Sequence, residues 1–167
     1  VRDQTASLAG GPWLAAAGAF GARPEECARL PVERTLSIVK PDALSAGHLG
    51  EIIAAYEAAG LRVIAATVMR LTPELAEGFY AEHRGKPFFG GLIDFMTSGI
   101  CMPMVLEGED AIERVRAIHG ATDPADAAPS TIRARFGTQV TRNAVHGSDS
   151  LASAAREVAF FFPQLGA

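Results

Sequence analysis

The residues best suited to chemistry are concentrated in segment 143–150, which reads Asn-Ala-Val-His-Gly-Ser-Asp-Ser. Here an imidazole, His146, lies beside Gly147, which leaves access to the ring, and next to a hydroxyl and a carboxylate. A neutral imidazole nitrogen is a competent nucleophile toward phosphorus, provided that an acceptor on its other nitrogen fixes the tautomer and stabilises the cation formed. Glu157 lies far enough into the following helix to be that acceptor. An isolated histidine is more often a structural or surface group, so this segment alone leaves both interpretations open.

Few of the basic residues are lysines: the chain has 13 Arg but only two Lys, Lys40 and Lys86. Lys40 stands where an expected strand ends, directly before Pro-Asp, and a strand end can direct a point charge into a cleft. An ordinary surface lysine is the alternative. The sequence has neither a Gly-x-x-x-x-Gly-Lys-Ser/Thr loop nor a Gly-x-Gly-x-x-Gly fingerprint, so any phosphate would be held by side chains.

Alternation and apolar runs predict the strands that must position these groups. Residues 35–40 alternate like a half-buried strand that stops at Pro41. Further strands are expected over 61–70, 100–106 and 143–147. Within the third of these, Pro103 conflicts with a strand because proline cannot donate to the ladder, so we expect an edge position, a bulge or a lost hydrogen bond there.

Helical spacing predicts the elements between the strands. Apolar residues from Leu49 to Tyr56 recur at helical intervals, and Thr72-Pro73-Glu74 is a typical helix start, for a helix expected to end near residue 85. A short helix is expected around 92–96. Two more are expected over 111–119, ended by Gly120, and over 151–161, capped from within 148–150. Residues 121 onward, rich in Ala, Asp and Pro, are expected to form a loop.

The order of these elements predicts an α+β fold, a ferredoxin-like sandwich in which helices cover a small, mostly antiparallel sheet. A length of 167 residues favours one domain. We assign it to residues 32–167. Residues 1–31 are expected to form a flexible N-terminal extension, because Ala and Gly are abundant there and periodicity is weak. A signal peptide is the alternative for that segment, and its internal Gly and Pro argue against it.

Composition excludes several functional classes. With 49% hydrophobic and 20% charged residues and a net charge of −4, the chain is neither disordered nor strongly steered toward nucleic acid, and no specific nucleic-acid partner is expected. No apolar run approaches the roughly 18 residues of a membrane span, so no membrane association is expected. The two cysteines, Cys27 and Cys101, lack metal-ligand spacing and favour a reducing compartment, here the cytoplasm.

Six segments, met in order, give the chain from Glu33 to its C-terminus a close resemblance to the nucleoside diphosphate kinases. The region from Glu33 to the C-terminus covers about four fifths of the sequence, and the last of the segments is highly specific. The segments are Thr35-Leu36-Ser37-Ile38-Val39-Lys40-Pro41-Asp42, Gly78-Phe79-Tyr80, Arg84-Gly85-Lys86-Pro87-Phe88-Phe89, Gly120-Ala121-Thr122-Asp123-Pro124, Thr131-Ile132-Arg133 and Asn143-x-x-His146-Gly147-Ser148-Asp149.

The resemblance implies transfer of the terminal phosphoryl group of a nucleoside triphosphate such as ATP to a nucleoside diphosphate. The reaction would be ping-pong, through a phosphorylated His146, and broad in the bases it accepts. Mg²⁺ would be the cofactor, held mainly by the nucleotide phosphates and not by a protein metal site. A homo-oligomer, either tetramer or hexamer, is also implied.

The resemblance also assigns roles by motif position. Phosphates would be gripped by Lys40, Arg116 and Arg133, with Thr122 as an additional hydroxyl donor. The remaining positions would support the imidazole, hold the base or reach the sugar: Tyr80, Ser148 and Glu157 for the imidazole, Phe88 and Val140 for the base, Asn143 and Lys40 for the sugar.

These roles suit phosphoryl transfer, whose loose transition state depends on positioning and charge stabilisation. Each residue alone has an ordinary structural alternative, but six ordered matches outweigh those alternatives jointly. A catalytically silent nucleotide-binding or scaffold relative remains the competing hypothesis, and a nucleic-acid-binding regulator is disfavoured by charge. Ser130 departs from the family's usual glycine, which predicts strain if a positive φ is needed there. His83 and His119 have no assigned role.

Overall fold

The computed structural model describes residues 32–165, so the expected N-terminal extension, residues 1–31, lies outside the described residues. Short 3₁₀ turns at Ala81–His83, Pro124–Asp126 and Pro163–Leu165 join the longer elements. In chain order, these longer elements are β1 (Val32–Val39), α1 (Pro41–Ser45), α2 (Leu49–Ala58), β2 (Arg62–Ala66), β3 (Met69–Arg70), α3 (Pro73–Phe79), α4 (Phe89–Thr97), β4 (Ile100–Glu109), α5 (Ala111–His119), α6 (Ile132–Phe136), β5 (Val145–Gly147) and α7 (Leu151–Phe161).

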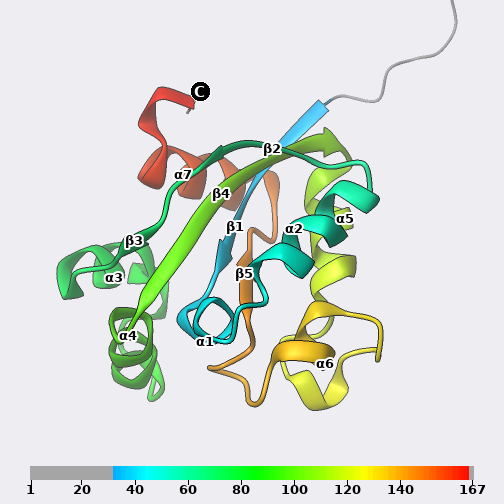
Figure 1. The fold of residues 1–167 in the computed structure, drawn as a ribbon. Helices are drawn as coiled ribbons and strands as arrows, with labels where there is room; N and C mark the ends of the chain where they lie inside the picture. The colour runs from blue at the N-terminus through cyan, green and yellow to red at the C-terminus, as the bar shows by residue number, and fades with distance from the viewer. Residues whose placement is uncertain (1–31, 166–167) are drawn as a thin grey trace, which may run out of the picture.

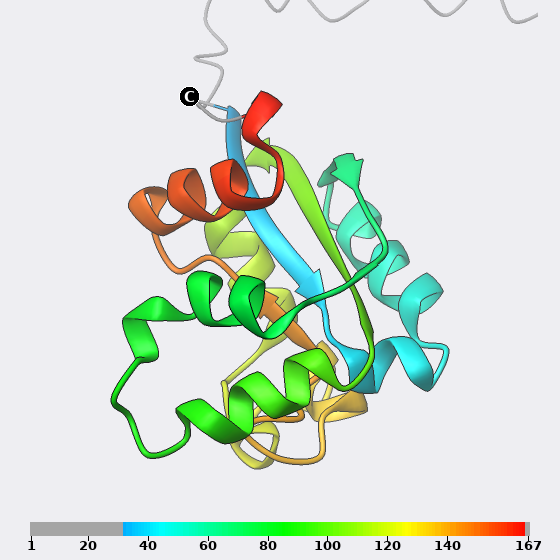
Figure 2. The same ribbon diagram turned by 90° about the vertical axis from the view of Figure 1, so that its left-hand side faces the viewer.

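The strands form one small antiparallel sheet in the order β2-β4-β1-β5, with β3 also pairing with β4. The longest ladder joins β1 to β4, from Val32 opposite Glu109 to Val39 opposite Met102. Helices α3, α4 and α7 lie on one side of this sheet, and α1, α2 and α5 on the other (Figures 1 and 2). The predicted α+β, ferredoxin-like class is therefore confirmed.

Alternation along the central strand β1 divides the core between the two faces of the sheet. Leu36 and Ile38 belong to a buried cluster with side chains of α3, α4 and α7. Val39 belongs to a second cluster, which includes Tyr56 of α2 and Val115 of α5. Because successive side chains of a strand point to opposite faces, a single strand supplies both cores. Both faces of β1 are buried, which explains why its central residues are almost uniformly apolar or small.

The strand expected over 61–70 is interrupted, and Pro103 supplies the reason. Pro103 lies within β4, which has a neighbouring strand on each side, so the prediction of an edge position for Pro103 is wrong. The Pro103 carbonyl accepts a hydrogen bond from the Thr67 amide at 3.0 Å. The nitrogen and oxygen of one strand residue point to the same neighbour, so the missing N–H also faces this strand. Opposite Pro103, the strand that pairs with β4 is interrupted and divides into β2 and β3. This agrees with the predicted loss of a hydrogen bond at Pro103.

The predicted helices are largely present, with shifted ends. The Thr72 hydroxyl accepts from the Leu75 amide and begins α3, but this helix ends at Phe79, earlier than the expected residue 85. Helix α5 ends before Gly120, whose φ of 80° only glycine adopts readily. A reciprocal capping box with Ser150 begins α7.

Two short helices, α1 and α6, and part of the expected last strand differ from the sequence prediction. Both helices fall where no helix was expected, and their five-residue length leaves little periodicity to detect. The last strand, expected from residue 143, begins at Val145 because Ala144 adopts a positive φ of 68°. Asp110 is the other non-glycine residue with a positive φ in the described range, so the conditional strain at Ser130 does not arise.

The sheet register brings the ends of the two functional segments together. Strand β5 runs antiparallel to β1, with His146 opposite Ile38. Just beyond this ladder, the Lys40 amide donates to the Ala144 carbonyl at 2.9 Å, and the Asp42 carboxylate accepts from the Ala144 amide at 3.1 Å. The residues after β1 thus hold the turn that precedes His146. Within residues 32–165, no helix is both long and apolar enough for a membrane span.

Candidate active site

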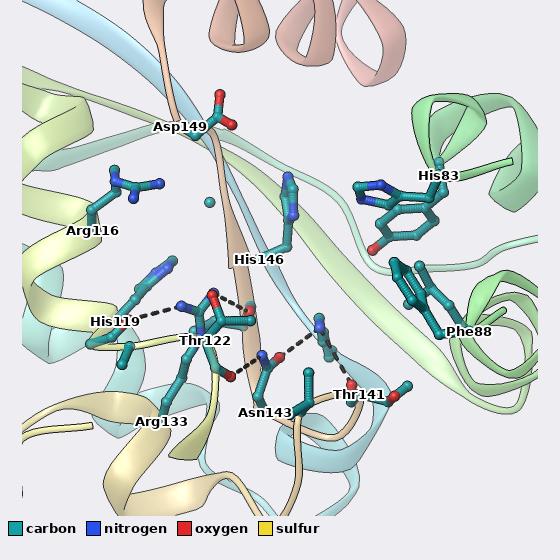
Figure 3. A pocket seen from close by; sticks show the side chains of 18 of the residues that line it. His83, Phe88, Arg116, His119, Thr122, Arg133, Thr141, Asn143, His146 and Asp149 are labelled. Carbon is teal, nitrogen blue, oxygen red and sulfur yellow. Dashed lines mark hydrogen bonds between the residues drawn. The ribbon is translucent and has the colours of Figure 1, made fainter. Parts of the chain in front are cut away.

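A cavity of about 630 Å³ lies where β5 meets the ends of α5 and α6 and the segment between α3 and α4. Its size is typical of a small-molecule pocket. Of the site residues predicted from sequence, Ser148 is the one that does not line it, and Figure 3 shows several of the others around the hollow. Those in the lining are Lys40, Tyr80, Phe88, Arg116, Thr122, Arg133, Val140, Asn143, His146 and Glu157.

The imidazole of His146 is oriented by a buried carboxylate. Its Nε2 lies 2.8 Å from Oε2 of Glu157, and the Ser148 hydroxyl donates to the same oxygen at 2.9 Å. Because a carboxylate accepts hydrogen bonds, it holds the proton of a neutral imidazole on Nε2. Nδ1 is then the unprotonated nitrogen, available for attack on an electrophile. Ser148, outside the cavity lining, therefore acts on His146 through Glu157.

Two aromatic rings define the walls around this imidazole. Phe79 and Tyr80 both present edge contacts to His146, with centroid distances of 5.3 and 6.2 Å. Burial raises the pKa of Tyr80, so its hydroxyl keeps its proton. That hydroxyl has no hydrogen-bond partner within the described chain. Tyr80 therefore carries a buried hydroxyl donor without a partner close to the His146 ring.

Lys40 is fixed in place although it is almost fully buried. Its Nζ donates to Oδ1 of Asn143 at 2.6 Å, and the Asn143 amide donates in turn to the Thr122 carbonyl at 2.8 Å. Burial lowers the pKa of Lys40 to about 8, helped by the charge of Arg133 and opposed by Asp42. The ammonium group is thus charged at neutral pH. It is held in one position by Asn143, whose side-chain amide is itself fixed by the Thr122 carbonyl.

The two arginines differ in how firmly they are held. Arg133, in the first turn of α6, donates to the carbonyls of Gly120 at 2.8 Å and Val145 at 3.2 Å. Burial also lowers the pKa of Arg133. Arg116, on α5, is exposed and forms no ion pair within residues 32–165. One guanidinium is therefore anchored at the base of the cavity, while the other can adjust to a bound anion.

The opposite end of the cavity is apolar and open. Phe88 and Val140 line it, with 51% and 53% of their surfaces exposed. The ring of Phe88 lies 5.6 Å from that of His83 and 5.8 Å from Nζ of Lys86. Exposed apolar side chains of this size inside a pocket offer flat faces to an aromatic ligand.

Sequence reasoning left three other lining residues, His83, His119 and Asp149, without a role in the site. The clearest omission is His119. A usable signal existed, because His119 follows Val115 by four residues and therefore shares the buried face of α5. Asp149 was noted only as a carboxylate near the histidine, although its position in the 143–150 segment made a place in the lining predictable.

An imidazole held by a carboxylate, three cations and apolar side chains around one cavity are the groups expected in a phosphoryl-transferring enzyme that binds a ligand with an aromatic ring. The family model of nucleoside diphosphate kinases, "Nucleoside diphosphate kinase", matches residues 33–166. The chain therefore belongs to the nucleoside diphosphate kinase family.

Two solved structures of nucleoside diphosphate kinases are similar to this chain. The Aquifex aeolicus enzyme is 51% identical, with a TM-score of 0.77 over 79% of this chain and 96% of that one. A halophilic enzyme from Halobacterium salinarum, in complex with CDP, is 46% identical, also with a TM-score of 0.77, over 79% of this chain and 88% of that one. The protein is thus a nucleoside diphosphate kinase, which transfers the terminal phosphate of a nucleoside triphosphate to a nucleoside diphosphate. A catalytically silent relative is not favoured.

Proposed function

We propose that the phosphoryl group passes through Nδ1 of His146 in a ping-pong reaction. The observation that carries this proposal is the 2.8 Å contact between Nε2 and Glu157, which leaves the other nitrogen as the nucleophile. In the first half-reaction, the Nδ1 lone pair bonds to the terminal phosphorus while the bond from that phosphorus to its bridging oxygen breaks. The departing diphosphate keeps the electron pair, and Glu157 stabilises the imidazolium. In the second half-reaction, a terminal oxygen of another diphosphate displaces the imidazole.

The cations of the cavity are proposed to hold the phosphates and to stabilise charge during transfer. Lys40 and Arg133 are held by protein acceptors before any ligand arrives. Such preorganised groups stabilise a transition state without reorganisation at the moment of reaction. Arg116, exposed in the lining, would close on the phosphate chain, and Thr122 would add a hydroxyl donor.

Tyr80 is proposed to contribute its unpartnered hydroxyl near His146, since burial keeps it protonated. Asn143 is proposed to reach the sugar together with Lys40. One of its N–H groups is engaged by Thr122 and one acceptor position by Lys40, so the amide retains one donor and one lone pair for a sugar hydroxyl.

Mg²⁺ is proposed to enter on the nucleotide phosphates. The carboxylates that line the cavity already have partners: Glu157 accepts from His146 and Ser148, Asp149 from Ser150, and Glu82 pairs with Arg156. Among the described residues, no cluster of three or more ligating side chains is found. This donor set fits a metal carried by phosphate oxygens, where Mg²⁺ would supply charge neutralisation.

Broad base tolerance is proposed from the apolar end of the cavity. Phe88 and Val140 present faces and not hydrogen-bonding groups, and every nucleobase has a π-face that such surfaces accept. Purine and pyrimidine nucleotides are therefore expected to be substrates alike.

Incubation with ATP labelled at the γ-phosphate tests the proposed intermediate. We expect a phosphoenzyme that is stable in alkali, labile in acid and discharged by GDP, as expected for a phosphohistidine. Absence of label on protein that is folded and binds ADP would overturn the phosphohistidine route.

We also propose an oligomeric state and a cellular location for this protein. A homo-oligomer, tetramer or hexamer, is supported by the open edge of β2 and by exposed apolar side chains such as Val32 and Leu151. Light scattering on a size-exclusion column measures the mass. A cytoplasmic location, proposed from the cysteine pattern, is tested by cell fractionation.

A further inference from the structure

His119 is a histidine of the cavity for which the proposed mechanism has no use. It is the last residue of α5, is only 1% exposed, and lines the cavity. Figure 3 shows its ring between Arg116 and Arg133, on the side of the hollow away from Phe88. His119 can donate a hydrogen bond to an anion in the cavity only from the ring nitrogen that carries the proton, so its tautomer decides what it can bind.

A chain of three buried side chains answers this question. Nε2 of His119 lies 2.7 Å from the Tyr56 hydroxyl, which lies 2.9 Å from the Ser37 hydroxyl. Burial raises the pKa of Tyr56, so its phenol stays protonated. A phenol is the better donor and an imidazole nitrogen the better acceptor, so Tyr56 donates to Nε2 and accepts from Ser37. This arrangement places the proton of a neutral His119 on Nδ1.

The protonated Nδ1 edge of the His119 ring faces β5, the strand that contains His146. A methyl group built on Gly147 would lie 2.8 Å from Cε1 and 3.0 Å from Nδ1 of His119. Gly147 itself lines the cavity directly after His146. Within residues 32–165, Nδ1 has no hydrogen-bond acceptor of its own, since the polar contact of this ring is the one through Nε2. The donor is therefore unused and lies against Gly147, the residue that follows His146.

Burial, together with nearby positive charge, keeps His119 neutral in this position. Burial lowers its pKa well below the usual range, and the positive groups of Arg133, His146, Lys40 and Arg116 act in the same direction. A neutral N–H can approach a phosphate oxygen without adding to the repulsion among these cations. An apolar side chain would fill the same space but would give the anion no donor.

We propose that His119 is a further phosphate-binding residue of this kinase, donating a hydrogen bond from Nδ1 to a phosphate oxygen of the bound nucleotide. Ser37 and Tyr56 are positioning residues that fix the tautomer from outside the cavity. The inference rests on the proposed function, because it needs phosphates bound next to His146.

Calorimetric titration of the full-length protein with ADP tests the contact. A single hydrogen bond to a charged group predicts that His119→Leu weakens ADP binding by about 10-fold. Tyr56→Phe removes the group that fixes the tautomer and is expected to weaken binding by a smaller factor, about 3-fold. The effects of the two substitutions should not add in the double variant, because Tyr56 acts only through His119. His48→Leu, a histidine outside the cavity lining, serves as the matched control and should bind ADP as the unmodified protein does.

Nitrogen NMR of the unmodified protein gives a readout that needs no variant. We expect His119 to show a protonated Nδ1 and an unprotonated Nε2, and expect the Nδ1 signal to shift when ADP binds. A proton on Nε2, or an Nδ1 signal that ADP leaves unchanged, would overturn the inference, as would unchanged ADP affinity in a folded His119→Leu variant. Labelling with γ-labelled ATP separates the two proposals. A phosphoenzyme that forms normally while these tests fail removes the role of His119 alone, and a missing phosphoenzyme removes the proposed route.

Discussion

The two ends of the cavity are built by opposite means. At the end proposed to bind phosphates, Lys40, Arg133 and His119 are mostly buried, and each is held by hydrogen bonds to other protein groups. At the end proposed to bind the base, Phe88 and Val140 are half exposed and present apolar surface to the cavity. Fixed dipoles and charges stabilise a developing charge, whereas flat faces tolerate different rings. With these proposed roles, the rigid groups lie where the chemistry is common to all substrates, and the exposed apolar groups lie where substrates differ.

This division predicts that substitutions at the two ends will have different signatures. Loss of a group at the phosphate end removes transition-state stabilisation and lowers the rate for every nucleotide. Loss of a group at the base end removes contact made equally in the ground and transition states, which raises KM and leaves kcat nearly constant.

The largest effect is expected from His146→Ala. Because this substitution removes the proposed nucleophile, turnover should fall by about four orders of magnitude or more. A coupled assay of nucleotide exchange measures the loss, and circular dichroism checks that the variant folds normally. Activity above a few per cent of the unmodified protein would show that the nucleophile is another residue.

Arg133→Met is expected to have the next largest effect. Removing one charged contact from the transition state costs about 2 to 4 kcal/mol, or about 30- to 1,000-fold in kcat/KM. Steady-state kinetics with several nucleotides should show a similar loss for each. Arg62→Met, at an exposed arginine outside the cavity lining, is the matched control and should stay close to the unmodified rate. A loss confined to one base would contradict the division between the two ends.

The buried ammonium of Lys40 predicts a dependence on pH. Its pKa of about 8 means that the group is charged below this pH and loses its positive charge as the pH rises through it. Since the charged form is the one proposed to bind phosphate, kcat/KM should fall above about pH 8, by about 10-fold at pH 9. In Lys40→Met the rate should be low throughout, and this inflection should be missing. The same inflection in the variant would assign it to another group.

Phe88→Ala is expected to have the smallest effect, at the base end. Stacking on an aromatic side chain contributes about 1 to 3 kcal/mol, and the exposure of this ring points to the lower limit, about 5-fold in KM. Kinetics with purine and pyrimidine diphosphates should show comparable increases in KM and a nearly unchanged kcat. Phe160→Ala, at an exposed phenylalanine outside the lining, controls for loss of an aromatic ring. A strong preference for one base in Phe88→Ala would show that this side chain does more than stack.

Local signals made much of the fold predictable. The Thr72 cap, the stop at Gly120 and the helix from Leu151 to Phe161 depend on neighbours within one or two turns, and each is present in the structure. The interruption opposite Pro103 was not predictable in detail, because it depends on which strand faces the missing N–H. Short helices such as α6 were missed because five residues show too little periodicity.

Local patterns in the sequence were enough to predict the types of the longer elements and the chemical groups of the site, because caps, alternation and the Asn143 to Asp149 motif involve neighbouring residues. Which of these groups come into contact depends on the three-dimensional packing. The antiparallel pairing of β1 with β5 sets Lys40 beside the turn before His146, and the packing of α5 on α2 buries His119 against Tyr56. Contacts between residues so distant in sequence follow from strand register and core packing, which no local pattern specifies.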